Sequence, residues 1–564
     1  MQSLLVNRFF RSRYFIAAVA GLAWTGAFPD ISIAGLAWVA PALLVAATLG
    51  KPAPDTFRIG YVGGLVHYLS MLYWLLLIPY RWHGIPLAPA VGWLALAAFL
   101  ALFPAAWVWL IHSRQGQAAE LAGPPASGAL SPHWIGRALW AVSGAAVWVA
   151  LEMFLARVLG GFPWDLLGVS QLPLVPLIQV CSLTGVYGVS FLVVWLSLSL
   201  LCAGLSIIRR PGRGSIWVGE VFLPVLAVAM VFNLGLREIR HQPAPARTVK
   251  ALLVQPSIPQ TVIWNADQDS HRFEELVRWS DQLLNDHPSD LMIWPESAVP
   301  KMLRYDTNTF AAVTGLAQRH HVWLIVGSDD AELLAGSANP DEAEYFNSSF
   351  LIGPAGELRE RYIKRNLVVF GEYLPFQHWL PFLKWFTPIS GGFTPGTHAV
   401  QFHLDSLAVW TAVLICFEDV FPQLGRNDVQ PHTDFLVNIT NDGWFGRGAA
   451  QWQQAASAAL RAVENRVPLV RCTNNGLTCW IDADGRIRDI LRDARGTIYG
   501  PGFLSVELPL PAPGEPHALA FYTRHGDWFG WACVGVALCV VLAKIVRASQ
   551  RKRQTPTAQP PSPA

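Results

Sequence analysis

Charged side chains are scarce in this sequence. Asp, Glu, Lys and Arg make up 14% of the 564 residues, whereas soluble domains carry about 25%. Apolar residues make up 52%, and the chain contains 25 Trp and 29 Phe, residue types that favour membrane interfaces. A wholly water-soluble protein is therefore excluded, and part of the chain must lie in lipid. The net charge of +2 gives no reason to expect nucleic acid as a partner.

Cysteine is also rare, and its seven residues are too scattered for a disulfide framework. Four of them lie in apolar runs, where we interpret them as small buried side chains: Cys181, Cys202, Cys533 and Cys539. Cys472 and Cys479 flank a turn, so a pairing between them in an oxidising compartment stays open. The sequence has no HxxH, HExxH or CxxC pattern and no Gly-rich phosphate loop before a suitable helix. We therefore expect no metal and no nucleotide cofactor.

Eight apolar stretches of about 20 residues are long enough to cross a bilayer as helices. They cover residues 13–28, 32–49, 57–80, 88–112, 137–158, 183–207, 216–236 and 527–546. An even number of spans places both chain ends on one side. The basic residues on that side are Arg8, Arg11, Arg13, Lys51, Arg58, Arg114, Arg137, Arg209, Arg210, Arg213, Lys544, Arg547, Arg551, Lys552 and Arg553. The positive-inside rule therefore predicts cytoplasmic termini and an external segment at about 250–510.

The external segment has an ordinary globular mix of charged and apolar residues. Short apolar runs predict buried strands at 250–255, 290–294, 322–327, 408–416, 434–440 and 469–473. Helical stretches are expected at 266–286, 307–320 and 449–466, and the last of these has apolar residues spaced for one buried face. Strands that alternate with helices indicate a layered α/β domain.

Three ionisable residues of this domain lie where short β-rich segments end. Glu296 follows the run that ends at Trp294, Lys364 lies in Tyr362-Ile363-Lys364-Arg365, and Cys416 closes the apolar strand before Phe417. A cysteine at a strand-to-helix turn lies near a helix N-terminus, which favours the thiolate. A carboxylate can take the thiol proton, and an ammonium can stabilise the oxyanion that forms on attack. Each residue alone has an ordinary structural explanation, but together they indicate a nucleophilic site.

The order Glu–Lys–Cys resembles the nitrilase superfamily, whose members carry this triad on an α-β-β-α sandwich. The whole chain, from the first span to the last, resembles the apolipoprotein N-acyltransferase family. The matching segments are Gly161-Phe162-Pro163-Trp164, Val254-Gln255-Pro256, Trp294-Pro295-Glu296, Phe370-Gly371-Glu372-Tyr373, Ile415-Cys416-Phe417-Glu418 and Asn441-Asp442-Gly443-Trp444. Asn366 and Val369 depart from the family pattern, which has His and Pro at these places near Lys364.

The resemblance implies a two-step acyl transfer without cofactor. Glu296 would deprotonate Cys416, which attacks the sn-1 ester of a phospholipid, while Lys364 and the backbone N–H of Phe417 hold the oxyanion. The α-amine of a diacylglyceryl cysteine on an apolipoprotein would then take the acyl group from the thioester. Glu372 and Glu418 are expected to position Lys364 and the amine, with a purely structural salt bridge as the alternative.

An aromatic, Pro-rich loop at 373–396 is expected to meet the lipid substrates, since interfaces favour aromatic side chains. We assign substrate contacts to Tyr373, Trp379, Trp385 and Phe386 of this loop, and to Trp264, which would line the acyl pocket. The alternative is a loop packed on its own domain and a Trp264 that packs in the core.

The resulting fold class is a helical bundle of about eight spans that carries a nitrilase-like sandwich. Its expected parts are a membrane domain with seven spans at 1–240, a periplasmic catalytic domain at 247–510, a last span at 527–547 and a basic, Pro-rich cytoplasmic tail at 548–564. We expect a monomer in the bacterial inner membrane.

Two other functions are compatible with parts of the sequence. A membrane-tethered amidase of the nitrilase type would use the same triad to hydrolyse C–N bonds. A transporter would need ionisable residues within the membrane, for which Glu152 and Glu220 are the main candidates.

Overall fold

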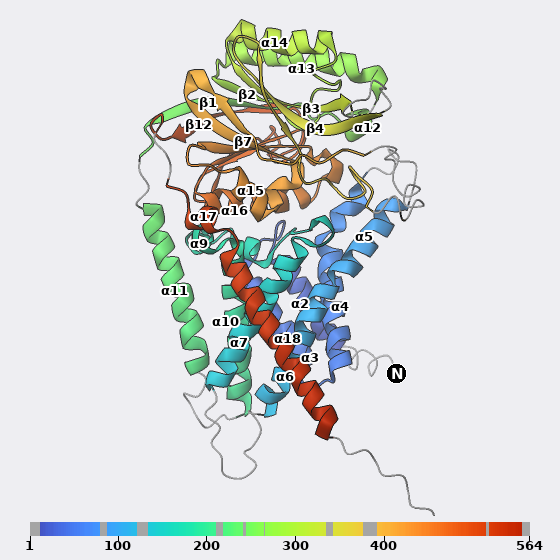
Figure 1. Ribbon diagram of the computed structural model, residues 1–564, viewed down its shortest axis with the longest axis vertical. Helices are drawn as coiled ribbons and strands as arrows, with labels where there is room; N and C mark the ends of the chain where they lie inside the picture. The colour runs from blue at the N-terminus through green and yellow to red at the C-terminus, as the bar shows by residue number, and fades with distance from the viewer. Residues whose placement is uncertain are drawn as a thin grey trace, which may run out of the picture.

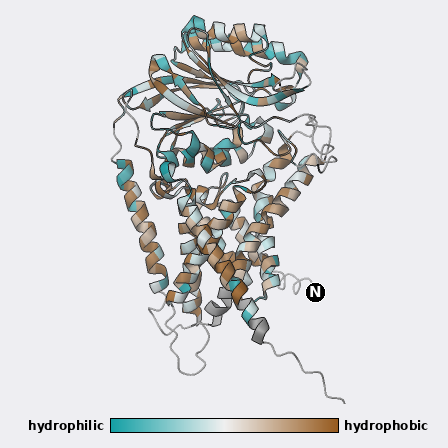
Figure 2. Cartoon of the chain, viewed as in Figure 1, coloured by the Kyte–Doolittle hydropathy of each residue, from teal (hydrophilic) through white to brown (hydrophobic). Residues whose placement is uncertain are grey.

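The computed structural model describes residues 12–78, 87–120, 134–209, 218–240, 244–263, 265–333, 342–375, 379, 392–514 and 518–554. Long helices form a bundle, and two stacked β-sheets with further helices stand at one end of it (Figure 1). Hydrophobic residues dominate the bundle, whereas hydrophilic residues gather on the half with the sheets (Figure 2). The predicted fold class is therefore confirmed.

The bundle helices vary in length and hydropathy. They are α2 (Arg13–Gly26), α3 (Ala40–Thr48), α4 (Ala53–Met71), α5 (Ala88–Leu100), α6 (Leu102–Glu120), α7 (Trp134–Leu155), α10 (Val186–Arg209), α11 (Val218–Arg240) and α18 (Trp528–Gln554). Five stretches of the described chain are long and apolar enough to cross a membrane: Ala88–His112, Trp134–Leu155, Val186–Ile208, Val218–Arg240 and Trp528–Val546. The other three predicted spans correspond to the shorter or less apolar α2, α3 and α4, so the count of eight is approximate.

Helices α2, α4 and α6 approach one another closely at small residues. A Cβ added to Gly21 would lie 2.3 Å from the carbonyl oxygen of Gly63, and one added to Gly64 would lie 2.3 Å from the Cγ of Pro104. Larger side chains are excluded at these contacts. The span predicted at 88–112 is split between α5 and α6, because Pro104 has no N–H to continue the hydrogen bonding across the junction.

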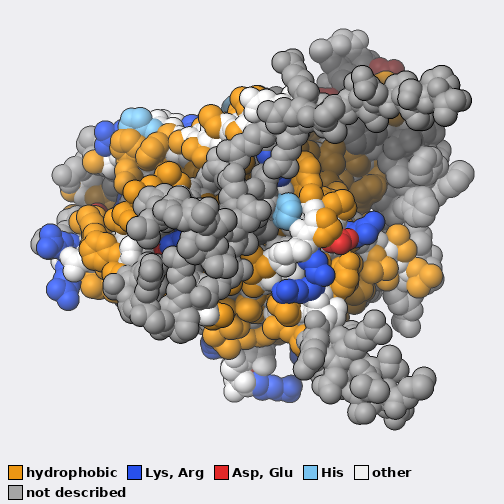
Figure 3. Space-filling view, turned by 90° about the horizontal axis from the view of Figure 1, so that it is seen from below, with side chains coloured by type: hydrophobic (Ala, Val, Ile, Leu, Met, Phe, Trp, Pro, Cys, Tyr) orange, Lys and Arg blue, Asp and Glu red, His pale blue; other side chains and the backbone are white. Residues whose placement is uncertain are grey.

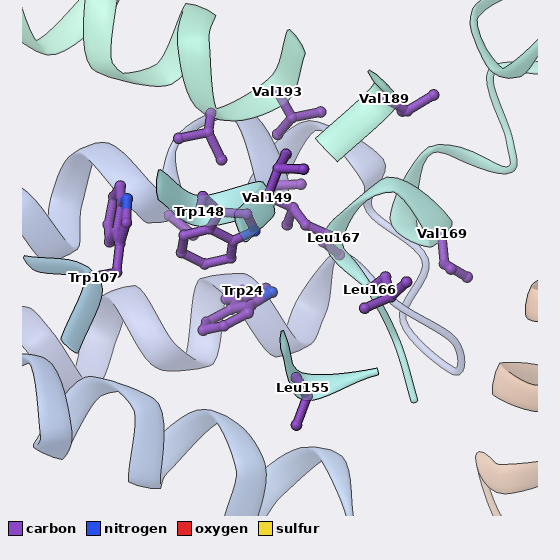
Figure 4. Packing of buried hydrophobic residues seen from close by; sticks show 14 of the residues in the cluster. Trp24, Trp107, Trp148, Val149, Leu155, Leu166, Leu167, Val169, Val189 and Val193 are labelled. Atoms are coloured by element: carbon purple, nitrogen blue, oxygen red, sulfur yellow. The ribbon is translucent and has the colours of Figure 1, made fainter. Parts of the chain in front are cut away.

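Interlocked aromatic rings fill the centre of the bundle. Trp24 of α2 stacks on His67 of α4 with ring centroids 3.7 Å apart, and Trp148 of α7 meets the edge of Trp107 of α6 at 4.8 Å. Figure 4 shows the three indoles together, with valines and leucines around them. Such large rings, packed at defined angles, fix the positions of the helices relative to one another.

Two six-stranded sheets form the other half of the molecule. The first has the order β12-β1-β2-β3-β4-β5, with β12 (Gly502–Leu510), β1 (Arg247–Gln255), β2 (Leu291–Ile293), β3 (Trp323–Leu333), β4 (Ala343–Ile352) and β5 (Leu358–Ile363). The second has the order β11-β10-β9-β8-β7-β6, with β11 (Ile487–Ile490), β10 (Cys479–Ile481), β9 (Leu469–Thr473), β8 (Phe435–Thr440), β7 (Val409–Ile415) and β6 (Gln401–Leu404). Their inner faces share one apolar core, which contains Ile293, Ile325 and Val437.

Helices cover the outer faces of both sheets and complete an α-β-β-α sandwich. Helices α13 (Ala266–Asp286) and α14 (Thr307–His320) lie on the first sheet, at the end remote from the bundle (Figure 1). Helices α15 (Pro422–Asp428) and α16 (Ala450–Asn465) lie between the second sheet and the bundle (Figure 1). The central strands β1–β3 and β7–β9 run parallel within each sheet, so their carboxyl ends meet at a common edge.

Helix α16 differs from its sequence-based expectation, because it is buried on two faces and not on one. Ala455 and Ala459 pack against the second sheet, whereas Ala456 and Leu460 pack into the core of the bundle. The apolar set predicted as one face, Ala455, Ala459, Leu460 and Val463, is divided between the two faces, and small or polar residues such as Ala456 and Gln453 complete the face toward the bundle. From the sequence alone, small and polar residues are compatible with an exposed helix face. The contact with the bundle is what buries them.

Gln453 of α16 joins the sandwich to the bundle. Its Oε1 accepts hydrogen bonds from the indole N–H groups of Trp74 (3.0 Å) and Trp164 (2.9 Å). Its Nε2 donates to the carbonyl oxygen of Pro29 at 3.0 Å. One buried amide thus satisfies polar groups from three segments of the membrane half.

We expect Gln453→Leu to lower the free energy of unfolding by about 2–4 kcal/mol, because it leaves two buried indole N–H groups and a carbonyl without partners. Thermal unfolding in detergent micelles should show a lower apparent melting temperature. The control is Gln268→Leu, at an exposed position of α13. Equal melting temperatures for the two variants would contradict this account of the junction.

Candidate active site

The structure brings the three predicted residues together between the two sheets. Glu296 follows β2, Lys364 follows β5 and Cys416 follows β7. All three are buried, with 6%, 1% and 7% of their surface exposed. The Lys364 Nζ lies 3.3 Å from Oε1 of Glu296, and both groups act electrostatically on the Cys416 thiol. Residues more than 100 positions apart in sequence therefore form one cluster.

Cys416 stands on a sharp backbone turn. Its φ of +55° lies in the left-handed region, which non-glycine residues occupy rarely and often at functional sites. The side chain of Asn438 donates to the carbonyl oxygens of Leu414 (3.2 Å) and Cys416 (2.9 Å). Arg471 in turn donates to Oδ1 of Asn438 at 2.8 Å. These bonds hold the turn that presents the sulfur.

The structure corrects the expectation of a thiolate stabilised by a helix. Cys416 is followed by a single 3₁₀ segment, Cys416–Val420, and not by a long helix. Burial, and then the negative charge of Glu296, raise the pKa of the Cys416 thiol, while Lys364 opposes the shift. The resting nucleophile is a neutral thiol, so attack requires a base.

Lys364 is a buried ammonium held between two carboxylates. Its Nζ donates to Oε1 of Glu372 at 2.8 Å and to Oε1 of Glu296 at 3.3 Å. Burial disfavours the charge, but Glu296 and Glu372 outweigh it and hold the pKa of Lys364 well above its usual value. The positive charge is therefore permanent and available to an oxyanion.

Both carboxylate oxygens of Glu296 accept hydrogen bonds that orient the side chain. Asn347 of β4 donates from Nδ2 to Oε1 at 2.8 Å, and the backbone N–H of Asn441 donates to Oε2 at 3.0 Å. The same Asn347 Nδ2 also lies 2.9 Å from Oε1 of Glu372. The base is thus fixed in place, as proton transfer from a defined thiol position requires.

Both halves of the chain match known families. Residues 20–199 match the family model described as the apolipoprotein N-acyltransferase N-terminal domain, and residues 250–500 match the one described as carbon-nitrogen hydrolase. A Geobacter metallireducens protein named apolipoprotein N-acyltransferase is 34% identical over 537 residues, which cover 94% of this chain and 95% of that protein. The chain belongs to the apolipoprotein N-acyltransferase family.

Other relatives in this family are more distant. The apolipoprotein N-acyltransferase of Vibrio cholerae is 29% identical and covers 86% of this chain and 90% of its own length. Among solved structures, a nitrilase-superfamily protein from Saccharomyces cerevisiae aligns with 48% of this chain and 92% of its own, at 17% identity and a TM-score of 0.35. The assignment of the sandwich rests on the carbon-nitrogen hydrolase match and on the layers described above.

Glu418 links the two segments that carry Lys364 and Cys416. Its carboxylate accepts hydrogen bonds from the backbone N–H groups of Ile415 (2.8 Å), Arg365 (2.7 Å) and Asn366 (3.0 Å). It therefore fixes the separation between the ammonium and the sulfur. Asn366, one of the two departures from the family pattern, lies in this turn while Lys364 keeps its partners.

The residues predicted to bind substrate lie in different environments. Tyr373 is partly buried, and its Oη lies 3.3 Å from where a Cβ on Gly160 would stand, so the ring reaches the membrane half. Trp379 is 86% exposed. Trp264, Trp385 and Phe386 lie outside the described residues. Phe417 directly follows the nucleophile, and its ring centroid lies 5.9 Å from the Lys364 Nζ.

Several polar residues at the site were missed from the sequence. Asn347 and Asn438 are buried within β4 and β8, and Arg471 is fully buried in β9. Amide and guanidinium groups are unusual in buried strands. Their presence there is the sequence signal that could have identified these residues as part of the site.

The possible disulfide between Cys472 and Cys479 is not formed. Cys472 and Cys479 are buried and free on neighbouring strands, where Cys479 pairs with Arg471. Among the residues described, no group of three or more His, Cys, Asp or Glu could hold a metal ion.

The neutral thiol gives a distinctive pH dependence. In a Cys539→Ser background, which removes the exposed thiol, alkylation of Cys416 by iodoacetamide should rise about tenfold per pH unit and continue past the ordinary thiol pKa of about 8.5. Mass spectrometry of the modified peptide measures the rate. A rate that is flat across neutral pH would mean a resting thiolate.

Proposed function

We propose that this chain transfers a fatty acyl group from a phospholipid to the N-terminal amine of the diacylglyceryl cysteine of apolipoproteins. The observation that carries the proposal is a buried Glu296–Lys364–Cys416 cluster in a sandwich joined to a membrane bundle. Membership of the apolipoprotein N-acyltransferase family agrees with it. The donor bond is assigned to the sn-1 ester, and the reaction needs no cofactor.

In the first half-reaction Glu296 takes the Cys416 proton while the sulfur attacks the ester carbonyl. The developing oxyanion lies against the Lys364 ammonium and the backbone N–H of Phe417, and each such donor lowers the barrier by about 3 kcal/mol. The C–O bond then breaks, and the leaving oxygen of the lysophospholipid takes the proton from Glu296. An acyl thioester remains on Cys416.

In the second half-reaction the acceptor amine attacks the thioester. The C–N bond forms, the C–S bond breaks, and a proton passes from the amine nitrogen through Glu296 to the sulfur. Glu372 keeps Lys364 charged in both steps. Glu418 fixes the separation between the Lys364 ammonium and the Cys416 sulfur.

The membrane setting follows from the surface of the bundle. Large apolar side chains stand exposed on it, among them Met230, Leu234, Leu538 and Leu542, an arrangement that water does not favour. Figure 3 looks at the end of the bundle remote from the sheets and shows Lys and Arg side chains among hydrophobic ones. By the positive-inside rule this end faces the cytoplasm. The proposed location is the bacterial inner membrane, with residues 247–510 in the periplasm and the protein a monomer.

The rival functions have less support. Glu220 forms an ion pair with Arg137, and Glu152 accepts hydrogen bonds from Trp148 and the backbone N–H of Leu167, so these two candidate residues both have structural partners. An amidase with the same triad would have no need of a membrane bundle.

Intact-mass spectrometry of the purified protein with phospholipid tests the proposal. We expect a mass increase of one acyl chain that is absent in Cys416→Ser and present in Cys539→Ser. Addition of a diacylglyceryl-cysteine peptide should move a labelled chain onto the peptide amine. Release of the label only as free fatty acid would instead indicate a hydrolase.

Trp379 is proposed to contact the lipid substrate together with Trp385 and Phe386. We expect Trp379→Ser to slow acylation by phospholipid more than acylation by a short, water-soluble ester, because only the lipid must leave the bilayer. Initial rates with the two donors measure this ratio. Tyr305→Ser, at a residue 61% exposed before α14, is the control. Equal losses with both donors would exclude a lipid-specific contact.

A further inference from the structure

A polar pair beside the triad has groups that the steps described so far do not use, namely the carboxyl of Asp329 and the amide oxygen of Asn347. Asp329 of β3 and Asn347 of β4 stand directly opposite each other in the antiparallel register, so their side chains share one face of the sheet. The Asn347 amide contacts Glu296 and Glu372, which identifies this face as the one that lines the site. The next residue, Asp330, binds Arg304 and Arg361 on the opposite face.

This pair offers hydrogen-bond acceptors that the described chain leaves unused. Asn347 is 97% buried, since only 3% of it is exposed, and its Oδ1 has no hydrogen-bond partner among the described residues. Asp329 is partly buried. The nearby Lys364 ammonium pairs with Glu296 and Glu372 and not with Asp329. A buried acceptor without a donor is costly, so the arrangement suits a ligand that brings N–H groups.

The charge balance favours a cationic ligand. The carboxyls of Glu296, Glu372 and Asp329 surround a single ammonium, that of Lys364. Burial, followed by Glu296 and Glu372, raises the pKa of Asp329 to about 7, Lys364 opposes the shift and Asp330 adds to it. A second positive charge would relieve this repulsion.

We propose that Asp329 and Oδ1 of Asn347 form the subsite that receives the ammonium group of the acyl acceptor. This inference rests on the proposed acyl transfer and names where its second substrate binds. Asn347 joins the two functions, because its Nδ2 holds the base Glu296 while its Oδ1 faces the amine.

The subsite also explains how the amine becomes a nucleophile. The bound ammonium gives one proton to the Asp329 carboxylate, which leaves a neutral amine; an α-amino group has a pKa near 7.7–8.0, close to that of Asp329. The amine then attacks the thioester, Glu296 takes the second proton and passes it to the departing Cys416 sulfur. Asp329 finally releases its proton to water, and the site is restored.

The variant Asp329→Asn separates the two half-reactions. In the full-length protein we expect thioester formation from phospholipid, followed by intact mass, at an unchanged rate. The KM for a diacylglyceryl-cysteine peptide should rise about ten- to a hundredfold, the value of a charge-assisted hydrogen bond. Discharge of the thioester by hydroxylamine, which is uncharged at neutral pH, should stay unchanged. Asp329→Ser should likewise raise the KM for the peptide and leave the rate of thioester formation unchanged.

Glu344→Gln is the matched control, since it removes a carboxylate from an exposed position of the same strand pair. It should alter neither half-reaction. If Asp329→Asn slows thioester formation as much as transfer, or leaves the KM for the peptide unchanged, the subsite is overturned while acyl transfer stands. If the unaltered protein forms no thioester at all, both proposals fail.

Discussion

The buried charge of Lys364 is the constraint on which the site depends. Removal of an ammonium from water costs several kcal/mol, and the cost is recovered only if partners meet it with good geometry. Here Glu296 follows β2, Glu372 lies in the segment after β5, and the amide of Asn347 contacts both carboxylates. The strands of the first sheet must therefore pair in one register before the charge is tolerated. The second sheet supplies Cys416, and its packing against the first sheet sets the sulfur beside its base.

A neutral resting thiol follows from this arrangement. The carboxylates that stabilise the Lys364 charge also raise the pKa of Cys416, so the sulfur stays protonated until a substrate carbonyl is in reach. A thiolate exposed to many small electrophiles would react without selection. In this site the ammonium instead gains a new negative partner when the oxyanion forms, and its interaction is stronger in the transition state than in the ground state.

The sequence predicted the layered architecture because apolar runs mark most of its strands and helices. Glu296 and Cys416 each follow such a run, whereas Lys364 follows the charged strand β5, and the triad was identified from its resemblance to the nitrilase superfamily. Asn347, Asn438 and Asp329 were missed because their roles depend on which strands pair and on which face each residue lies. The second buried face of α16 was missed for a similar reason, since only the bundle beneath it makes Gln453 an internal residue.

The junction through α16 has a consequence for chemistry on lipids. The site lies in a domain that is rich in hydrogen bonds and ion pairs, whereas the proposed donor is confined to a bilayer. A flexible tether would let the site move relative to the lipid, and a displacement of about 1 Å can cost a hundredfold in rate. Gln453 and Glu464 of α16 instead bind Trp74, Trp164 and the N–H of Val186 directly. The sandwich is thereby held at a fixed height above the bundle, so the membrane half acts as part of the catalytic scaffold and not only as an anchor.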